Sequence, residues 1–443
     1  MADTRSVLGP QRRRTADPTR PDRPDRPGWT HRFPRLPRLP RPSRPDGGPR
    51  WYRPESWPPD VLTLAGYWAA SRLVMLALVV TGRVQRPGEL RLYRQWCDQL
   101  LGGSFPVGDV TWQYPPGAAL VMLAPGLLRP LGYAAGFVAL TLAADAAVLA
   151  ALLLASRGSG RSRAGARLWA LGLPLLLNLP YLRYDVLVTA VAVAALLAQG
   201  RRPRLGGLLA GLGALVKVWP ALTVLGTPRG RTTRAAWLSL LASAAVLALL
   251  LATAFRGAFD FLGAQHHRGV EFESLGGSAL QVARLLGWSG QVRLRYGSVE
   301  FHGPYVSSVA GASLLLTVAA FGWLLLWRVR ARRWTAATPY DAALAAVLLF
   351  TVTSRVISPQ YLIWLIGLAA VCLTVRDTVQ RPVAVLLLLA TGLTTVGFPL
   401  CFSRMVAGTV PAVAVIVLRN ALLAAAAVLC CRRLWRTTTR PAV

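Results

Sequence analysis

Carboxylates and aromatic rings that could take part in group-transfer chemistry are concentrated in one polar stretch of the sequence, residues 83–116. Glu89 and Asp109 lie there beside several tyrosines and tryptophans, although the chain as a whole is rich in arginine. Partial desolvation of a carboxylate, as at a membrane surface, raises its pKa toward the range of a working general base. The neighbouring rings offer flat faces for sugars. A solvated loop has a similar composition, so composition alone leaves both interpretations open.

Ionisable side chains inside apolar stretches form a second group of candidates. They are Arg72, Asp145, Lys217 and Arg419, and Lys217 is the only lysine of the chain. An ionisable residue at bilayer depth is costly and usually faces a protein interior or a water-filled cavity. The alternative to a functional role is a buried ion pair, or a side chain that extends to the interface. For Lys217 the pair would be with Asp145 or with Asp185.

The elements that must position these residues are membrane-spanning helices. Of the 443 residues, 54% are hydrophobic and 15% are charged, which is outside the range of ordinary soluble domains. Apolar runs of the roughly 17 to 25 residues that cross a bilayer recur from Asp60 onward. Because lipid offers backbone groups no partners, an all-α polytopic integral membrane protein is predicted. The net charge of +32 falls in arginine blocks between apolar segments, which indicates topology and not a nucleic-acid partner.

The chain divides into three parts by composition. Residues 1–56 are rich in arginine and proline and are predicted to be a disordered cytoplasmic tail. Residues 57–436 are predicted to form the transmembrane domain, and residues 437–443 a short cytoplasmic tail. The arginine blocks therefore predict a multi-pass plasma-membrane protein with both termini in the cytoplasm.

Two long polar interruptions are predicted to lie on the outer face, at about 83–116 and 257–303. Placing every basic block inside gives ten crossings, with residues 206–226 entering the membrane and returning. Counting this segment and residues 117–130 as full spans gives twelve crossings. The sequence leaves both topologies open.

No metal site or cofactor is expected. The five cysteines have no metal-ligand spacing. His266 and His267 are adjacent but lack a third ligand at helical spacing. The chain also has no Asp-x-Asp pair of the kind that holds a divalent ion under a nucleotide sugar.

Several segments of the chain resemble one family of membrane enzymes. GELRLY (88–93), followed by FPVGDVTWQYPPG (105–117), resembles the first outer loop of polyprenyl-phosphate-sugar-dependent glycosyltransferases of the GT-C superfamily. The resemblance is strongest to glycosyltransferase family 87, which includes bacterial α-mannosyltransferases. Three later segments match in the expected order: NLPYLRYDVLVTA (178–190), GLGALVKVWP (211–220) and SRVISPQYLIWL (354–365).

The resemblance implies a GT-C-like bundle of about 10 to 12 transmembrane helices with hexosyltransferase activity, in particular mannosyltransferase activity. Such an enzyme moves one sugar from a polyprenyl-phosphate donor to a lipid or cell-wall glycan acceptor on the outer face. The transfer needs a carboxylate that takes the acceptor's proton and a cation at the departing phosphate. The family's two acidic positions correspond to Glu89, assigned as the base, and to Asp109, its rival.

Cations for the donor phosphate are expected at Lys217, Arg355 and Arg183. The Lys217 ammonium precedes a proline that frees helix carbonyls, and the planar guanidinium of arginine suits phosphate oxygens. A structural pair for the lysine, and a topological role at a helix end for each arginine, are the alternatives. The other substrate-binding residues expected from the matched motifs are Tyr93, Tyr114, Asp185, Ser358, Gln360 and Tyr361.

The sequence departs from the family's pattern in three places. The usual base is an aspartate, and Glu89 is one methylene longer, which changes its reach toward an acceptor hydroxyl. Arg183 and Asp185 stand where a Gly-Gln-x-Asn break is common. Tyr361 and Trp364 follow the Ser-Pro segment, where some family mannosyltransferases carry histidines.

A secondary transporter or lipid flippase is the alternative function. In that case Asp145, Lys217 and Arg419 would bind coupling ions or substrate. Transporters often contain two similar halves, and the sequence shows no such repeat. The sugar, the acceptor, the linkage formed and the oligomeric state do not follow from the sequence.

Overall fold

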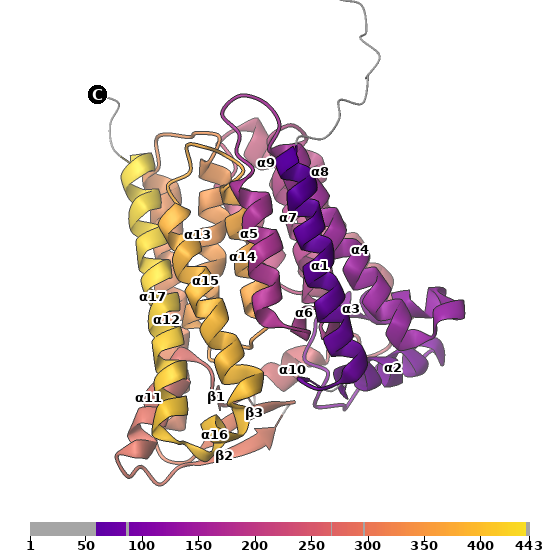
Figure 1. Ribbon diagram of the computed structural model, residues 1–443, viewed down its shortest axis with the longest axis vertical. Helices are drawn as coiled ribbons and strands as arrows, with labels where there is room; N and C mark the ends of the chain where they lie inside the picture. Colours follow the sequence, from indigo (N-terminus) through magenta and orange to yellow (C-terminus); the bar gives the residue numbers. More distant parts are fainter. Residues whose placement is uncertain (1–58, 86–87, 267, 296, 440–443) are drawn as a thin grey trace, which may run out of the picture. The chain divides into compact units, whose positions relative to one another are not determined.

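The computed structural model describes residues 59–439 except 86–87, 267 and 296. The predicted tail of residues 1–56, residues 440–443 and His267 therefore lie outside the described part of the chain. The described part is a bundle of helices with one small sheet (Figure 1). The prediction of an all-α polytopic membrane protein is confirmed.

Among the described residues, six helices are long and apolar enough to cross a membrane. Their outer faces expose apolar side chains, such as Leu73 (67% exposed) and Leu315 (71% exposed). In a membrane protein these faces meet lipid, and every backbone group of the span is paired within its helix. The six are α1 (Pro59–Thr81), α4 (Tyr133–Ala155), α9 (Arg231–Ala254), α12 (Val306–Arg330), α15 (Arg381–Thr395, continued by η5, Val396–Leu400) and α17 (Val410–Thr439).

Shorter apolar helices complete the bundle. The longest of them, α13, has 16 residues, which gives about 24 Å against a hydrocarbon core of about 30 Å. These short helices therefore end inside the bundle, where polar side chains of the connecting segments can gather. These helices are α3 (Ala118–Leu123) with η1 (Ala124–Leu127), α5 (Ala164–Gly172) with η3 (Leu173–Leu176), α6 (Leu179–Leu182), α7 (Asp185–Gln199), α8 (Pro203–Val216), the 3-10 helix η4 (Trp219–Gly226), α13 (Thr338–Thr353) and α14 (Tyr361–Cys372).

The segment formed by α8 and η4 enters the bundle and returns. α8 ends before Lys217, and α9, which follows η4, runs parallel to α8: Gly207 meets Ala236, and Gly211 meets Leu240, in the same order along both helices. Two parallel neighbours in succession require a return segment between them, and η4 provides it. A Cβ at Gly207 would lie 2.0 Å from the Ala236 carbonyl oxygen, so this close approach of the helices requires glycine.

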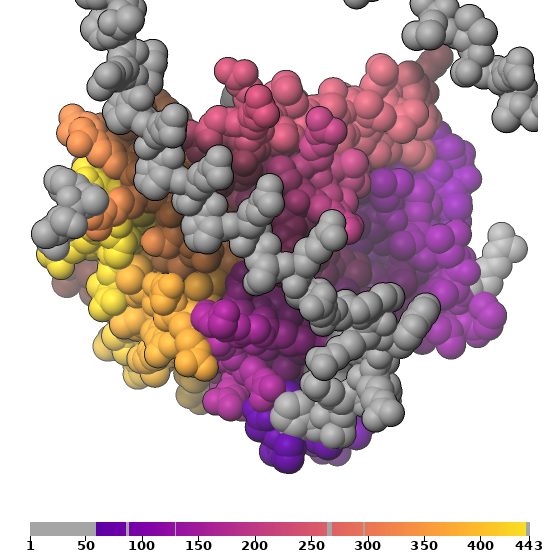
Figure 2. Space-filling view, turned by 90° about the horizontal axis from the view of Figure 1, so that it is seen from above, coloured from indigo at the N-terminus to yellow at the C-terminus, as the bar shows by residue number. Residues whose placement is uncertain are grey.

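The start of α1 and the end of α17 lie at the same end of the bundle (Figure 1). Several arginine blocks meet there. Arg163 forms a salt bridge with Asp60 at 2.6 Å, and the backbone N–H groups of Arg332 and Arg333 donate to the carbonyl oxygen of Thr438. Figure 2, seen from this end, shows the C-terminal helices (orange to yellow) on one side and the N-terminal helices (indigo to magenta) on the other.

The two stretches predicted as outer loops lie at the opposite end and contain regular structure (Figure 1). The first forms α2 (Gly88–Leu101), an amphipathic helix whose apolar side chains recur every three to four residues and are buried. The second contains α10 (Phe261–His266), α11 (Leu275–Leu285) and an antiparallel sheet in the order β1-β3-β2. The strands are β1 (Val270–Glu271), β2 (Gln291–Arg295) and β3 (Ser298–His302), and α16 (Phe402–Ala407) lies at the same end.

Candidate active site

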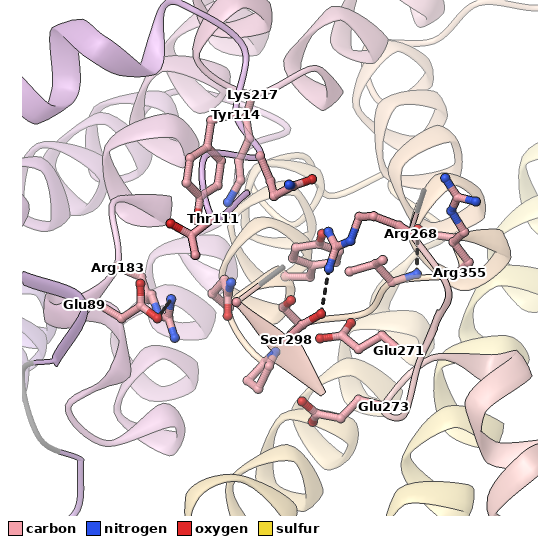
Figure 3. A pocket seen from close by; sticks show the side chains of 18 of the residues that line it. Glu89, Thr111, Tyr114, Arg183, Lys217, Arg268, Glu271, Glu273, Ser298 and Arg355 are labelled. Atoms are coloured by element: carbon pink, nitrogen blue, oxygen red, sulfur yellow. Dashed lines mark hydrogen bonds and ion pairs between the residues drawn. The ribbon is translucent and has the colours of Figure 1, made fainter. Parts of the chain in front are cut away.

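A cavity of about 520 Å³ lies at the end of the bundle that carries α2 and the sheet (Figure 1), and Figure 3 shows it from close by. Its wall combines the start of α2, residues 111–115, the break before α7, the turn between α8 and η4, residues 268–273 and residues 354–364. Most of these are loops, helix ends or segments between helices, and residues 268–273 include the two-residue strand β1. The short helices are what bring them together, because each ends inside the bundle.

Glu89 and Arg183 form one side of this cavity. Glu89 lies in the first turn of α2, and its Oε1 is 2.6 Å from Nη1 of Arg183, in the break between α6 and α7. Both side chains keep part of their surface open, at 30% for Glu89 and 18% for Arg183. The guanidinium thus holds the carboxylate in place while leaving it accessible from the cavity.

Lys217 sits in a cage of aromatic rings on the same cavity. Its Nζ lies 4.6 Å from the ring centroid of Tyr184 and 4.9 Å from that of Trp364, with Tyr114 and Tyr361 within 6 Å. Rings at this distance stabilise a cation through their quadrupoles. The alternative of an ion pair is also realised, because Lys217 Nζ lies 2.5 Å from Oδ1 of the buried Asp185.

The third expected cation, Arg355, lines the cavity as well, in the break between α13 and α14. Ser358, Gln360 and Tyr361 follow it along the same wall. Tyr114 is the remaining expected substrate-binding residue that reaches the lining.

Two expected site residues lie away from the cavity lining. Tyr93 is fully buried on α2, where its ring packs 5.5 Å from that of Phe137. Asp185 is 1% exposed and reaches the cavity through two lining residues, Lys217 and Trp364. Tyr93 and Asp185 are therefore placed to support the residues that line the cavity.

Asp109, the rival base, also lies outside the lining. Its Oδ1 accepts hydrogen bonds from the backbone N–H and the hydroxyl of Thr111 (2.8 and 2.6 Å), and its Oδ2 accepts from Nε1 of Trp96 (2.7 Å). Partial burial opposes ionisation, but these hydrogen bonds outweigh it and hold the pKa of Asp109 below its ordinary value. Both donors line the cavity, so Asp109 positions part of its wall.

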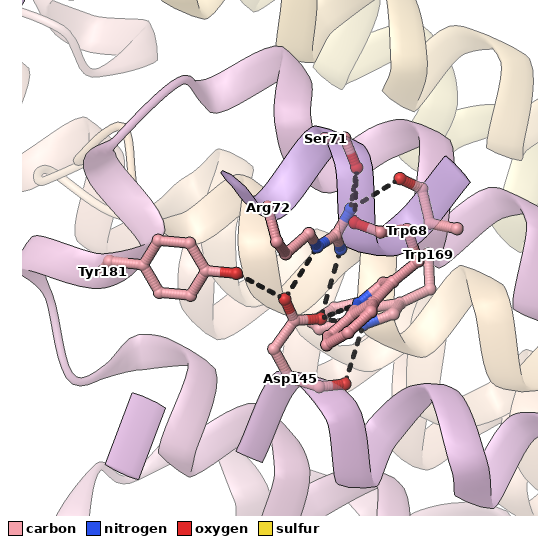
Figure 4. Close-up of polar contacts among 7 residues, drawn as sticks. Trp68, Ser71, Arg72, Asp145, Trp169 and Tyr181 are labelled. Carbon is pink, nitrogen blue, oxygen red and sulfur yellow. Dashed lines mark hydrogen bonds and ion pairs between the residues drawn. The ribbon is translucent and has the colours of Figure 1, made fainter. Parts of the chain in front are cut away.

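Arg72 and Asp145, two of the buried charges found in the sequence, pair with each other (Figure 4). Asp145 accepts from Nε of Arg72 at 2.8 Å, and also from Trp68, Trp169 and Tyr181. The carboxylate is completely buried and has partners on both oxygens. It therefore joins α1, α4, α5 and α6, and it leaves nothing with which to bind Lys217.

The acidic residues of the sheet region were not among the expected site residues. Glu271 and Glu273 line the cavity, and Arg268 lies beside them. Arg268 Nε is 3.1 Å from Oε1 of Glu300, and Nη2 of Arg419 is 3.5 Å from Oε1 of Glu273. Burial raises the pKa of both Glu271 and Glu273 above the ordinary range.

A local signal for these glutamates exists in the sequence. The run VEFE (270–273) alternates apolar and acidic residues, which is the period of a strand and places both acids on one face. Val270 and Phe272 are buried in a second hydrophobic cluster with Phe301 and Met405. That packing turns the acidic face toward the cavity.

The fold and the cavity together define an integral membrane protein with a charged, aromatic-lined site at one end of a helical bundle. The model of glycosyltransferase family 87 matches residues 112–359, which is more than half of the chain. The chain belongs to glycosyltransferase family 87 and is a glycosyltransferase of the membrane. Neither a search of curated proteins nor a search of solved structures found a match to it.

The matched range includes Arg183, Lys217 and Arg355. It begins after Asp109, so that neither Asp109 nor Glu89 lies within it. The assignment of the base therefore depends on the geometry of the cavity.

Proposed function

We propose that the protein transfers a hexose, specifically mannose, from a polyprenyl-phosphate donor to a lipid or cell-wall glycan acceptor at the outer face of the plasma membrane. One observation carries the proposal. A single cavity is lined by the carboxylate of Glu89 and by all three expected cations, Arg183, Lys217 and Arg355. These groups meet the needs of the reaction, since one group must accept a proton and at least one cation must bind the phosphate.

Glu89 is assigned as the general base. In the reaction the acceptor hydroxyl oxygen forms a bond to the anomeric carbon of the donor sugar, and the bond from that carbon to the phosphate oxygen breaks. The bonding electrons leave with polyprenyl phosphate, and the hydroxyl proton passes to Glu89. The pairing with Arg183 at 2.6 Å orients the carboxylate toward the cavity. Asp109 is the weaker candidate because its two oxygens already accept three hydrogen bonds.

Lys217 and Arg355 are assigned to the phosphate of the donor. The Lys217 ammonium has one partner in Asp185 and faces the cavity, which leaves it capacity for phosphate oxygens. Apolar residues of the same lining, Phe350 and Phe398 among them, suit the isoprenoid chain. Fixed cations at the departing phosphate stabilise the charge that develops there.

The proposed orientation places both termini in the cytoplasm. It is supported by the arginine blocks at the end of the bundle that carries both ends of the described chain. The cavity opens at the other end and would then face outward.

The test is a transfer assay with purified protein in lipid nanodiscs, using labelled polyprenyl-phosphate mannose and a membrane lipid extract as acceptor. Glu89→Gln is expected to lower the rate by about 10² to 10⁴, whereas Asp109→Asn keeps most of it. Asp98→Asn is the matched control, because Asp98 is an exposed acid on the same helix. Loss of transfer in Asp109→Asn alone would assign the base to Asp109. Absence of transfer from any polyprenyl-phosphate sugar would refute the proposed function.

A further inference from the structure

The sheet region presents three acidic side chains near the cavity, and they differ in how far they are already used. Glu300 accepts from Nε of Arg268 (3.1 Å) and from the backbone N–H of Gly269 (3.0 Å). Glu273 faces Arg419 at 3.5 Å. Glu271 forms no ion pair within 4 Å among the described residues. Glu271 is therefore the acid of this group whose carboxylate can still form a hydrogen bond to a ligand.

Glu271 is buried, yet one of its oxygens has no partner. The residue is 4% exposed and lines the cavity, and its Oε2 has no hydrogen-bond partner among the described residues. A buried polar atom without a partner is costly, so it indicates a group that a ligand completes. Figure 3 shows the Glu271 carboxylate pointing into the cavity, toward the side where Glu89 and Arg183 lie.

Hydrogen bonds fix the backbone around Glu271, so the position of its side chain is defined before a ligand binds. Its N–H donates to the carbonyl oxygen of Arg355 (3.0 Å), and its own carbonyl oxygen accepts from the hydroxyl of Ser274 (2.8 Å). Ser274 also caps α11 through the N–H of Gly277 (2.9 Å). A Cβ on Gly277 would lie 2.3 Å from the Glu271 carbonyl oxygen, so the helix start packs directly against this residue.

The charges nearby decide what kind of ligand fits. Arg268 and Arg355 line the same part of the cavity, and the buried Arg419 lies next to Glu273, with its Nε and Nη1 without partners among the described residues. These three arginines balance the three glutamates of the region, Glu271, Glu273 and Glu300, so no net negative charge favours an amine. A divalent cation is disfavoured as well, because no three Asp, Glu, His or Cys side chains gather within the described ranges.

A neutral ligand rich in hydroxyl groups fits these surroundings. A hydroxyl donates a charge-assisted hydrogen bond to a carboxylate, which is stronger than a bond between neutral groups. The half-buried ring of Phe402, which packs edge to face on the buried Phe272 at 5.5 Å, lies in the same wall and gives a sugar ring an apolar surface. A simple long-chain alcohol has a single hydroxyl group, which attacks the donor, so it has none left to donate to the Glu271 carboxylate.

We propose that Glu271 binds a hydroxyl group of a sugar acceptor, so that the acceptor is a glycan or glycolipid and not a simple lipid alcohol. This inference rests on the proposed function and specifies its acceptor. Glu271 holds the acceptor from the side opposite Glu89, and its backbone bond to Arg355 fixes this acceptor side relative to a donor-side cation.

The test measures transfer from polyprenyl-phosphate mannose to two defined probes, octyl α-mannoside and octanol. Wild type is expected to use the mannoside and not the alcohol. Glu271→Gln should raise KM for the mannoside about 10-fold, which corresponds to about 1.4 kcal/mol, with kcat and the donor KM within about 2-fold. Glu271→Asp, which keeps the charge, should recover part of the loss. Asp260→Asn is the matched control, since Asp260 is an exposed acid in the same region outside the cavity lining.

Transfer of the sugar to water by Glu271→Gln reports whether the variant is folded and binds donor, and it should match wild type within about 2-fold. An unchanged KM for the mannoside in Glu271→Gln would overturn the inference, as would equal use of octanol by wild type. A joint loss of donor hydrolysis, kcat and donor affinity would show a structural role and would overturn it too. No transfer by wild type to any acceptor would instead refute the proposed function, and with it the basis of this inference.

Discussion

Replacing Lys217 by methionine asks whether this ammonium serves the fold, the reaction or both. Its Nζ lies 2.5 Å from Oδ1 of Asp185, and the two side chains are 12% and 1% exposed. Removing one partner of a buried pair leaves the other charge uncompensated and costs about 3 to 5 kcal/mol. Methionine keeps much of the aliphatic volume, so this loss comes from the charge and not from a cavity. The single variant should therefore unfold at a lower temperature and transfer sugar slowly.

The double variant Lys217→Met/Asp185→Asn separates the two roles. It removes both charges, and the amide oxygen can still accept the hydrogen bond that Trp364 Nε1 gives to Asp185 Oδ1 at 2.6 Å. We expect the double variant to regain most of the thermal stability. Its rate should stay about 10² to 10³ below wild type, because the stabilisation of the leaving phosphate goes with the ammonium. Thermal unfolding followed by tryptophan fluorescence and transfer from polyprenyl-phosphate mannose measure the two quantities.

Arg94→Gln is the matched removal of one positive charge. Arg94 lies 3.8 Å from Asp98 on α2, and both side chains are about two-thirds exposed, at 68% and 67%. An exposed pair of this kind contributes about 0 to 1 kcal/mol, so neither stability nor rate should change measurably. If the double variant at Lys217 recovers its rate together with its stability, the charge serves the fold alone and its assignment to the donor phosphate is wrong.

Three further predictions concern the bundle and the loop that supports the cavity. Gly207→Val should destabilise the protein by about 3 kcal/mol, because even a Cβ there would lie 2.0 Å from a backbone oxygen. Gly66→Ala is the control: a Cβ there has nothing within 4 Å, so the unfolding midpoint should stay equal or rise slightly. Equal losses of stability in both variants would contradict the close packing at Gly207. Arg72→Met should lower the free energy of unfolding by about 3 to 5 kcal/mol, because it leaves the Asp145 charge buried and uncompensated. The double variant Arg72→Met/Asp145→Leu should recover most of this stability, with an unchanged transfer rate per folded molecule. A lower rate in the double variant would indicate a functional pair. Partial burial of Asp109 is outweighed by its hydrogen bonds, so its pKa falls on folding. The ionised carboxylate therefore stabilises the protein fully at pH values above the pKa of the unfolded chain. This contribution is lost as the pH falls through the lower pKa of the folded protein, below about pH 4. Asp109→Asn should therefore flatten the acid side of a plot of unfolding midpoint against pH, and an unchanged acid slope would contradict this.

The membrane part of the fold could be predicted because the bilayer restricts what a sequence can do. A span needs a long apolar run, and the arginine blocks mark one side of the membrane, so both features can be recognised in short stretches of sequence. The break at Lys217 is local as well, since a proline follows three residues later in GALVKVWPAL. Whether residues 206–226 return or cross the membrane could not be predicted from the local sequence. It depends on glycine contacts between α8 and α9, such as that of Gly207 with Ala236.

The partners of the buried charges could not be predicted, because they join residues far apart in the chain. Lys217 had two candidate partners in the sequence, Asp145 and Asp185. The choice follows from a competitor, since Arg72 lies 73 positions before Asp145 and takes its carboxylate. Glu271 was missed for a similar reason. Its unused oxygen becomes apparent only once Arg268 is seen to bind Glu300.

Asp145, Glu89 and Glu271 differ in how completely their carboxylate oxygens are hydrogen-bonded, and the difference coincides with their place in the fold. Asp145 is fully buried, accepts hydrogen bonds on both oxygens and lies away from the cavity. Glu89 and Glu271 line the cavity, the first with part of its surface open and the second with an oxygen that has no partner among the described residues. A carboxylate with all its partners inside the protein gains nothing from a substrate, whereas one with capacity left gains a hydrogen bond when a hydroxyl arrives. Hydrogen-bonding capacity for a hydroxyl group is therefore available at Glu89 and Glu271 and not at Asp145, which is why we propose a supporting role for Asp145 and acceptor-directed roles for Glu89 and Glu271.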